Sequence, residues 1–267
     1  MSSIFGEKMK KTLIGVGCSH TQGCAIEKNG KLLSQQLKDL YNREEVSPEW
    51  ITENFSWIGC LGNLLNVDEK INFGFGGRGV EQCSRALKNY SYKKVDLSNH
   101  LIIFQIPSLD RVEILNSYND KFVLTESIKY LHKNQRQDFF ENYYDTNYYQ
   151  YKFINELYFL QNYLQSLGAK IYFFDLFTPI RLKDIKDYSK EVVDTLHNNL
   201  NWSLELNKNI ELDELISSLN LLKLSDNPNL VRLSQENLLD DNHLSETGNR
   251  NLAKLIYKEI KNETTFT

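Results

Sequence analysis

Several features that define whole classes of protein are missing from this sequence of 267 residues. It contains no uninterrupted apolar run of about 18 residues, the length that a helix needs to cross a bilayer. Basic residues do not outnumber acidic ones, because Lys and Arg total 31, Asp and Glu total 35, and the net charge is -4. The chain therefore lacks the broad positive field of nonspecific nucleic-acid binders. We expect neither a membrane nor a nucleic acid as a partner.

A secretion signal and paired cysteines are missing as well. The first ten residues carry charge, but the apolar core of a signal peptide does not follow them, so we expect a cytoplasmic protein. The four cysteines, Cys18, Cys24, Cys60 and Cys83, have no paired spacing, which favours reduced thiols over a disulfide framework.

What the chain has in excess is aromatic side chains. Phe, Trp and Tyr make up 12% of the residues, and many of them fall in residues 139–163. Two interpretations are open for this segment. Its tyrosines either stack on sugar rings beside a site, or form the rim of a helix that packs on a sheet.

Apolar segments of strand type and helix type alternate along the chain, which favours an α/β sheet. Four short apolar runs predict strands, namely Lys11–Gly17, Ile71–Phe75, His100–Ile106 and Ala169–Phe177. Helical spacing predicts helices over 50–65, 81–90, 150–167 and from Ser245 onward, with Gly168 ending the third helix and Ser245 capping the last. Residues 219–225 and 230–234 are weaker candidates for a further strand.

A glycine-bracketed loop, Gly15-Val16-Gly17-Cys18-Ser19-His20-Thr21-Gln22-Gly23, directly follows the first predicted strand. Open α/β sheets bind ligands at this end of their strands. A Walker A loop needs a lysine that is missing here, and a dinucleotide fingerprint needs a glycine where His20 stands. A zinc site of Cys18, His20 and Cys24 lacks a fourth ligand at a familiar spacing. The loop is therefore interpreted as a tight turn that presents Ser19.

A second motif, Asp240-Asp241-Asn242-His243, lies just before the last predicted helix. An Asp three residues ahead of a His can accept a hydrogen bond from one ring nitrogen, while the other nitrogen takes a proton from a serine. Asp241 is the alternative to Asp240 in this role. Taken alone, the motif also fits a solvated acidic loop. Combined with the Ser19 loop, it indicates an activated hydroxyl.

These blocks, in this order, resemble those of the SGNH, or GDSL-type, serine hydrolases. The resemblance implies that Ser19 is the nucleophile and that Asp240 and His243 complete a catalytic triad. It also implies that the amides of Ser19 and Gly77, the latter in the segment Phe73–Gly79, form an oxyanion hole. The implied fold is a three-layer α/β/α sandwich, flavodoxin-like, with a central parallel sheet of about five strands and helical insertions.

The first block departs from the family's pattern at one position. Cys18 replaces the Asp that usually precedes the nucleophile. Its thiol is an alternative nucleophile, although an extended segment turns Cys18 away from the face that displays Ser19. Beside the nucleophile, His20 is a candidate substrate contact. Asn72, ahead of the second block, is expected to hold backbone.

The third block departs from the family's pattern throughout. In place of Gly-x-Asn-Asp, the chain has Phe104-Gln105-Ile106-Pro107-Ser108-Leu109-Asp110-Arg111. Gln105, Ser108 and Arg111 are candidates for the missing oxyanion donor. Gln105 and Arg111 are also candidate substrate-binding residues, and a guanidinium suits an anionic group of the substrate.

The sequence thus predicts one SGNH-hydrolase-like domain over residues 1–267, with insertions at about 112–150 and 178–230. The expected activity is hydrolysis of an acyl ester of a carbohydrate or another small molecule, with no metal and no organic cofactor. Acyl transfer by the same triad is one alternative. Binding of a glycan or a protein partner without catalysis is the other. The oligomeric state is left open.

Overall fold

The computed structural model of the chain describes residues 10–23, 27–28, 31–32, 47–94, 96–107, 111, 114–118, 121–125, 146–175, 212–222, 224 and 244–263. At its centre four parallel strands lie in the order β4-β1-β5-β8. They are β1 (Thr12–Gly17), β4 (Glu69–Gly74), β5 (His100–Ile106) and β8 (Lys170–Asp175), so all four predicted strands are present. Numbered along the chain, the spatial order is 2-1-3-4, which is the flavodoxin-like arrangement.

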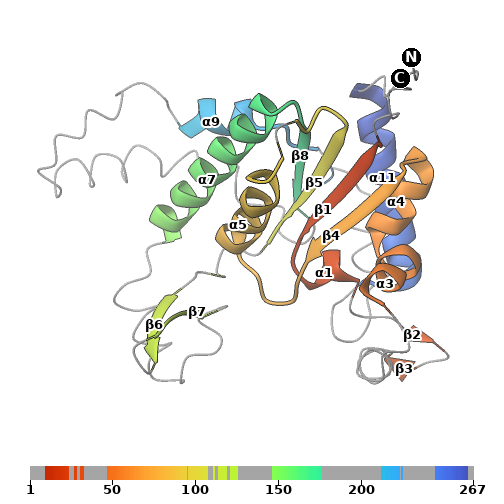
Figure 1. Ribbon diagram of the computed structural model, residues 1–267, viewed down its shortest axis with the longest axis horizontal. Coiled ribbons are helices and arrows are strands. Elements are labelled where there is room, and N and C mark those ends of the chain that lie inside the picture. Colours follow the sequence, from red (N-terminus) through yellow and green to blue (C-terminus); the bar gives the residue numbers. More distant parts are fainter. Residues whose placement is uncertain are drawn as a thin grey trace, which may run out of the picture.

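The register of the strands brings their carboxyl ends to one edge of the sheet. Gly17 of β1 pairs with Gly74 of β4 on one side, and Val16 pairs with Phe104 of β5 on the other. We call this end the carboxyl edge. The short helix α1 (Ser19–Gln22) lies there, next to the ends of β1 and β4 (Figure 1).

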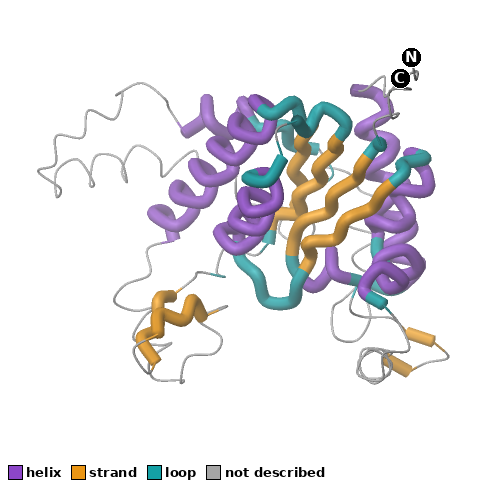
Figure 2. Tube along the Cα trace, in the orientation of Figure 1, coloured by secondary structure: helices purple, strands orange, loops and turns teal. Residues whose placement is uncertain are grey.

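Helices cover both faces of the sheet (Figures 1 and 2). One face packs against α5 (Val80–Ser91) and α7 (Thr146–Ser166), the other against α4 (Trp57–Leu65) and α11 (Glu246–Glu263). Successive residues of β1 face opposite layers, as a strand requires: Ile14 belongs to the first apolar cluster and Leu13 to the second. The predicted three-layer sandwich is confirmed. None of the helices in the described ranges has the length and apolar content of a membrane span.

A fifth strand is reduced to a single bridge beside β8. Leu221 pairs with Phe173 in parallel orientation, directly after α9 (Leu212–Ser218). The amide of Phe173 donates to the Asn220 carbonyl oxygen at 2.9 Å, and the Leu222 amide donates to the Phe173 carbonyl at 2.9 Å. Among the described residues of 219–225, the predicted strand is therefore present only as this bridge. The candidate at 230–234 lies outside the described residues.

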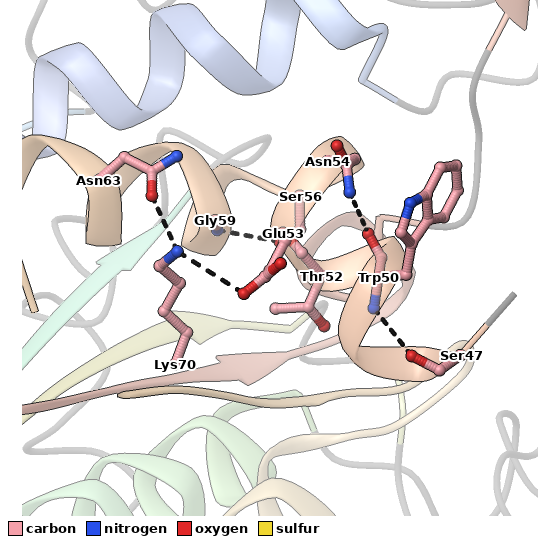
Figure 3. Close-up of polar contacts among 9 residues, drawn as sticks. All are labelled: Ser47, Trp50, Thr52, Glu53, Asn54, Ser56, Gly59, Asn63 and Lys70. Carbon is pink, nitrogen blue, oxygen red and sulfur yellow. Dashed lines mark hydrogen bonds and ion pairs between the residues drawn. The ribbon is translucent and has the colours of Figure 1, made fainter. Parts of the chain in front are cut away.

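The helix predicted over residues 50–65 is divided at Ser56. Helix α3 (Pro48–Phe55) ends before it and α4 begins after it, because Ser56 itself is extended, with φ -108° and ψ 155°. The Ser56 hydroxyl donates to the Thr52 carbonyl oxygen at 2.6 Å and accepts from the Gly59 amide at 3.2 Å (Figure 3). One side chain thus ends the first helix and caps the second.

Helix α7 carries its predicted apolar stripe into the core, with Phe153, Leu157, Leu160 and Leu164 all buried. Gly168 follows it in the left-handed region, at φ +90°, as predicted for a glycine that ends a helix. Tyr163 accepts a hydrogen bond from the Ser91 hydroxyl of α5 at 3.3 Å. Phe153 and Tyr163 of the segment 139–163 therefore belong to helix packing, whereas Phe159 of the same helix is 64% exposed. Residues 139–145 lie outside the described residues.

The structure also describes two strand pairs that do not belong to the central sheet. The hairpin of β6 (Ile114–Tyr118) and β7 (Lys121–Thr125) falls in the first predicted insertion, and α9 falls in the second. The other pair is β2 (Glu27–Lys28) with β3 (Lys31–Leu32). Most residues of the two predicted insertions lie outside the described ranges.

Asn249 joins the last helix to the start of α4. Its Oδ1 accepts from the Trp57 amide at 3.2 Å, and its Nδ2 donates to the carbonyl oxygens of Leu244 at 3.2 Å and Ser245 at 3.0 Å. The Ser245 hydroxyl accepts from the Gly248 amide at 3.0 Å, which confirms the predicted cap. Because Asn249 is only 2% exposed, water cannot easily replace these bonds.

We predict that Asn249→Ala lowers the free energy of unfolding by about 2–3 kcal/mol, since it leaves the buried Trp57 amide without an acceptor. Asn54→Ala is the matched control, because the Asn54 amide donates to a carbonyl oxygen on the exposed surface of α3. Its expected cost is below about 1 kcal/mol. Denaturant unfolding measures both, and equal losses would contradict the anchoring role of Asn249.

Candidate functional site

The carboxyl edge between β1 and β5 is where the order of the strands reverses. The chain goes from β1 to β4 on one side and then returns to β5 on the other side of β1. Open α/β sheets bind ligands at such a switch point, outside the carboxyl ends of the strands. The loop that follows β1 here is the glycine-bracketed loop containing Ser19.

The loop after β1 turns at once into the single turn of α1. The amides of Thr21 and Gln22 both donate to the Cys18 carbonyl oxygen at 3.0 Å, and the Gly23 amide donates to the Ser19 carbonyl oxygen at 3.2 Å. A Cβ at Gly17 would lie only 2.3 Å from Thr21 Oγ1, so a side chain does not fit where the chain folds back on itself. We call residues 17–23 the Ser19 turn.

Ser19 is one of three half-buried members of this turn, together with His20 and Gln22. Cys18 beside it is 3% exposed, and Thr21 is fully buried. This agrees with the expectation that Cys18 points away from the face that displays Ser19. Within the described part of the chain, the hydroxyl and the amide of Ser19 make no hydrogen bond. Amides at the start of a helix lack partners within the helix, so this donor is open to a ligand.

Gln105, near the end of β5, contacts the buried side of the Ser19 turn. Its Oε1 accepts from Thr21 Oγ1 at 2.5 Å, and its Nε2 lies 3.4 Å from Cys18 Sγ. Gln105 is 2% exposed, so its carboxamide is committed to the inner side of the turn. The sequence suggested Gln105 as a substrate contact or an oxyanion donor. Its surroundings favour a different role, that of positioning the Ser19 turn.

The loop after β4 packs against the Ser19 turn. The Phe75 amide donates to the Gly17 carbonyl oxygen at 3.1 Å, and the Gly76 amide donates to Gln22 Oε1 at 2.8 Å. A Cβ placed on Gly76 would lie 3.8 Å from the Cβ of Ser19. Two blocks that are more than fifty residues apart in the sequence thus meet at Ser19.

Asn72 of β4 also joins the Ser19 turn to the end of β4. Its Nδ2 donates to the Thr21 carbonyl oxygen at 3.1 Å, and its Oδ1 accepts from the Gly74 amide at 2.8 Å. The expectation that Asn72 holds backbone is confirmed.

Gly77 occupies the third position of a turn that begins at Phe75. The Arg78 amide closes this turn by donating to the Phe75 carbonyl oxygen at 3.4 Å. Gly77 has φ +84°, the left-handed value that a type II turn requires at this position and that favours glycine. Among the described residues the Gly77 amide has no acceptor. We call residues 75–79 the glycine turn.

The remaining predicted site residues are distributed unevenly. His20 lies in α1, next to Ser19, and is half-buried. Arg111 lies against the glycine turn, with its Nη1 3.5 Å from the Arg78 carbonyl oxygen. Asp240 and His243, together with Asp241, Ser108 and Cys24, lie outside the described residues, so the proposed triad stays a prediction. No group of three or more potential metal ligands converges within the described ranges.

His100 is the one other histidine in the described ranges. It lies at the start of β5, at the amino ends of the strands and so at the other end of the sheet from Ser19. Its Nε2 is 3.1 Å from the Tyr90 hydroxyl. Burial, followed by the charge of Lys94, holds the pKa of His100 below its usual value. This pair belongs to the packing of α5 on the sheet, and the sequence assigned His100 no role.

Sequence reasoning missed two residues of this region, Asn249 and Arg78. An Asn inside an amphipathic helix looks like a surface residue, and only its burial reveals Asn249 as an anchor. Arg78 follows a Gly-Gly pair directly, which was the available signal that a charged side chain stands at the end of a turn.

No family model and no curated protein matches the chain. Several solved structures match it at low sequence identity. A member of the lipolytic protein G-D-S-L family from Veillonella parvula DSM 2008 matches with 10% identity and a TM-score of 0.45, over 96% of this chain and 99% of that one. A protein from Lactobacillus plantarum matches with 12% identity and a TM-score of 0.44, over 97% of this chain and 100% of the other. A GDSL-like lipase from Bacteroides thetaiotaomicron VPI-5482 matches with 9% identity and a TM-score of 0.39, over 95% of this chain and 89% of that one. At these identities the likeness concerns the fold.

Proposed function

We propose that the protein is a serine hydrolase that cleaves an acyl ester of a carbohydrate or another small molecule. Ser19 is the nucleophile, His243 the general base and then the general acid, and Asp240 the residue that orients His243. The amides of Ser19 and Gly77 stabilise the oxyanion. The reaction needs no metal and no organic cofactor. The observation that carries this proposal is the contact between the Ser19 turn and the glycine turn at the carboxyl edge of the sheet.

The chemistry follows from the groups at this contact. The Ser19 hydroxyl attacks the ester carbonyl carbon while its proton passes to His243, which forms a tetrahedral intermediate. The carbonyl oxygen becomes negatively charged and accepts hydrogen bonds from the two amides. His243 then protonates the leaving alcohol, and the acyl group stays on Ser19. Water, activated by His243, attacks the acyl-enzyme, releases the acid and restores the serine.

The position of the last helix supports the assignment of His243. Leu244, the residue that follows the Asp-x-x-His motif, is 2% exposed and is held by Asn249, which also accepts from the Trp57 amide. Next to Trp57, the Ser56 side chain lies against Gly23 at the end of the Ser19 turn, since a Cβ on Gly23 would be 3.1 Å from the Ser56 Cβ. A series of contacts thus links the Ser19 turn, through Ser56, Trp57 and Asn249, to the residue after His243.

The third block explains why two oxyanion donors are proposed and not three. The carboxamide of Gln105 is engaged with Thr21 and Cys18, so it is not free to face a substrate. Loss of one side-chain donor costs on the order of 3–4 kcal/mol of transition-state stabilisation, a factor of 10²–10³ in rate. Two backbone amides still leave a working, though slower, ester hydrolase. The same reduction keeps a binding protein without catalysis as the second candidate.

We predict that a fluorophosphonate probe labels the wild-type protein at neutral pH and that Ser19→Ala abolishes the labelling. His243→Ala is expected to slow it by at least about 10²-fold, because the hydroxyl loses its base. Ser166→Ala is the control, since its hydroxyl only donates to the Tyr163 carbonyl oxygen on the exposed surface of α7. Intact-mass spectrometry measures the adduct. A folded wild-type protein that stays unlabelled would exclude the hydrolase and favour the binding protein.

A second prediction concerns Gln105 as a positioning residue. Gln105→Leu should lower the rate of labelling by about 10-fold or more, because Thr21 loses its acceptor and the Ser19 turn loses its support. Gln161→Leu is the matched control: Gln161 is also a buried glutamine, 3% exposed, but it binds the Ser218 carbonyl oxygen and the Asn220 amide and contacts no residue of the Ser19 turn through these bonds.

Both glutamine variants should lose about 2–3 kcal/mol of unfolding free energy, since each leaves buried groups unpaired. Only Gln105→Leu should slow the labelling of the folded protein at 25 °C. If the two variants slow labelling equally, Gln105 contributes to stability alone.

A further inference from the structure

The glycine turn carries an arginine that is fixed in place. The guanidinium carbon of Arg78 lies 4.9 Å from the centroid of the Phe75 ring, and its Nη1 donates to the Phe73 carbonyl oxygen at 3.2 Å. A flat cation stacked on an aromatic face and held by a carbonyl loses little freedom when it binds a ligand. Phe75 is 42% exposed, so this platform lies at the surface.

A second arginine lies against the same turn. Arg111 Nη1 is 3.5 Å from the Arg78 carbonyl oxygen. The Arg111 carbonyl oxygen lies where a Cβ on Gly79 would come within 2.0 Å, so the backbones after β4 and β5 touch at this point. The loops that follow β4 and β5 therefore bring two guanidinium-bearing residues to one turn.

Neither arginine is neutralised within the described part of the chain. Arg78 and Arg111 form no ion pair with a carboxylate there, whereas Arg250 pairs with Glu246 at 2.5 Å and Lys70 lies 3.9 Å from Glu53. The chain as a whole is acidic, with net charge -4, so this local concentration of positive charge is not a general property of the surface. A bound anion would pair with positive charge that no carboxylate of the described residues neutralises.

The turn is close enough to Ser19 to share a ligand with it. Gly76 lies in contact range of Ser19, and two residues span at most about 7 Å of backbone between Gly76 and Arg78. The Phe73 carbonyl that holds the Arg78 guanidinium belongs to a residue paired with Val16, three positions before Ser19. The backbone of Arg78 therefore lies within two residues of the position that contacts Ser19.

We propose that the glycine turn is an anion-binding subsite, separate from the oxyanion hole, in which Arg78, assisted by Arg111, holds a carboxylate or phosphate of the substrate. Resting on the hydrolase function proposed above, this makes the preferred substrates acyl esters that carry a negative charge. The planar guanidinium of Arg78 suits the fork geometry of such groups, and a charge-assisted hydrogen bond is about twice as strong as a neutral one.

The test compares three acetyl esters of similar shape, 4-acetoxybenzoate, 4-acetoxyphenyl phosphate and the uncharged 4-acetoxybenzamide. We expect wild-type kcat/KM to be at least about 10-fold higher for one or both anions than for the amide. The anion that is preferred distinguishes a carboxylate from a phosphate subsite. Arg78→Gln should lower the ratio of anion to amide by about 10-fold, and Arg111→Gln should lower it by a smaller factor.

Three controls make the result specific. Arg250→Gln removes an exposed arginine of α11 and should leave the ratio unchanged. Arg78→Lys keeps the charge but loses the fork geometry, so it should recover only part of the preference. Thermal unfolding of each variant reports whether loss of the bond to the Phe73 carbonyl has disturbed the fold. If Arg78→Gln is destabilised, the subsite is judged on Arg111→Gln, by whether this variant lowers the ratio of kcat/KM for the anionic esters to that for the amide.

The outcomes separate this proposal from the hydrolase function. If the protein cleaves all three esters with a ratio near 1, or if the ratio survives in Arg78→Gln and Arg111→Gln, the subsite is overturned and the hydrolase stands. If no ester is cleaved and Ser19 is not labelled, the hydrolase is overturned. Calorimetric binding of 4-hydroxybenzoate and phenyl phosphate then decides: binding lost in Arg78→Gln supports the anion subsite, and no binding overturns it as well.

Discussion

The pairing of β1 with a parallel strand on each side is the constraint on which the candidate site depends. Because β4 and β5 run in the same direction as β1, all three strands end at one edge, and the segments that follow them meet there. Gly17 pairs with Gly74, so the Ser19 turn and the glycine turn start side by side. A slip of one residue in either ladder would turn every side chain to the opposite layer and separate these groups.

The edge is made rigid mainly by backbone and amide groups. The inner side of the Ser19 turn is held by the Gln105 carboxamide and by Asn72, while Gln22 holds the Gly76 amide. The outer side leaves the Ser19 hydroxyl, the Ser19 amide and the Gly77 amide without partners among the described residues. Satisfied groups on the inside and open donors on the outside are what a preorganised oxyanion site needs.

The sequence alone was sufficient for features that depend on neighbours in the chain. Short apolar runs predicted the four strands, and the spacing of Phe153, Leu157, Leu160 and Leu164 predicted α7. The division at Ser56 was missed because periodicity continues across it, and a capping hydroxyl is not visible in a hydrophobic pattern. The role of Gln105 depends on partners 84 and 87 residues away, which no local pattern specifies.

That long separation also has a consequence for how the protein comes into being. On a ribosome the Ser19 turn is synthesised before its supports on β4 and β5, which follow some fifty to ninety residues later. Closing such large loops is entropically costly, and contacts of this kind form slowly. A growing chain therefore exposes the serine well before anything holds it in place, and the turn takes shape only once the sheet around it has paired.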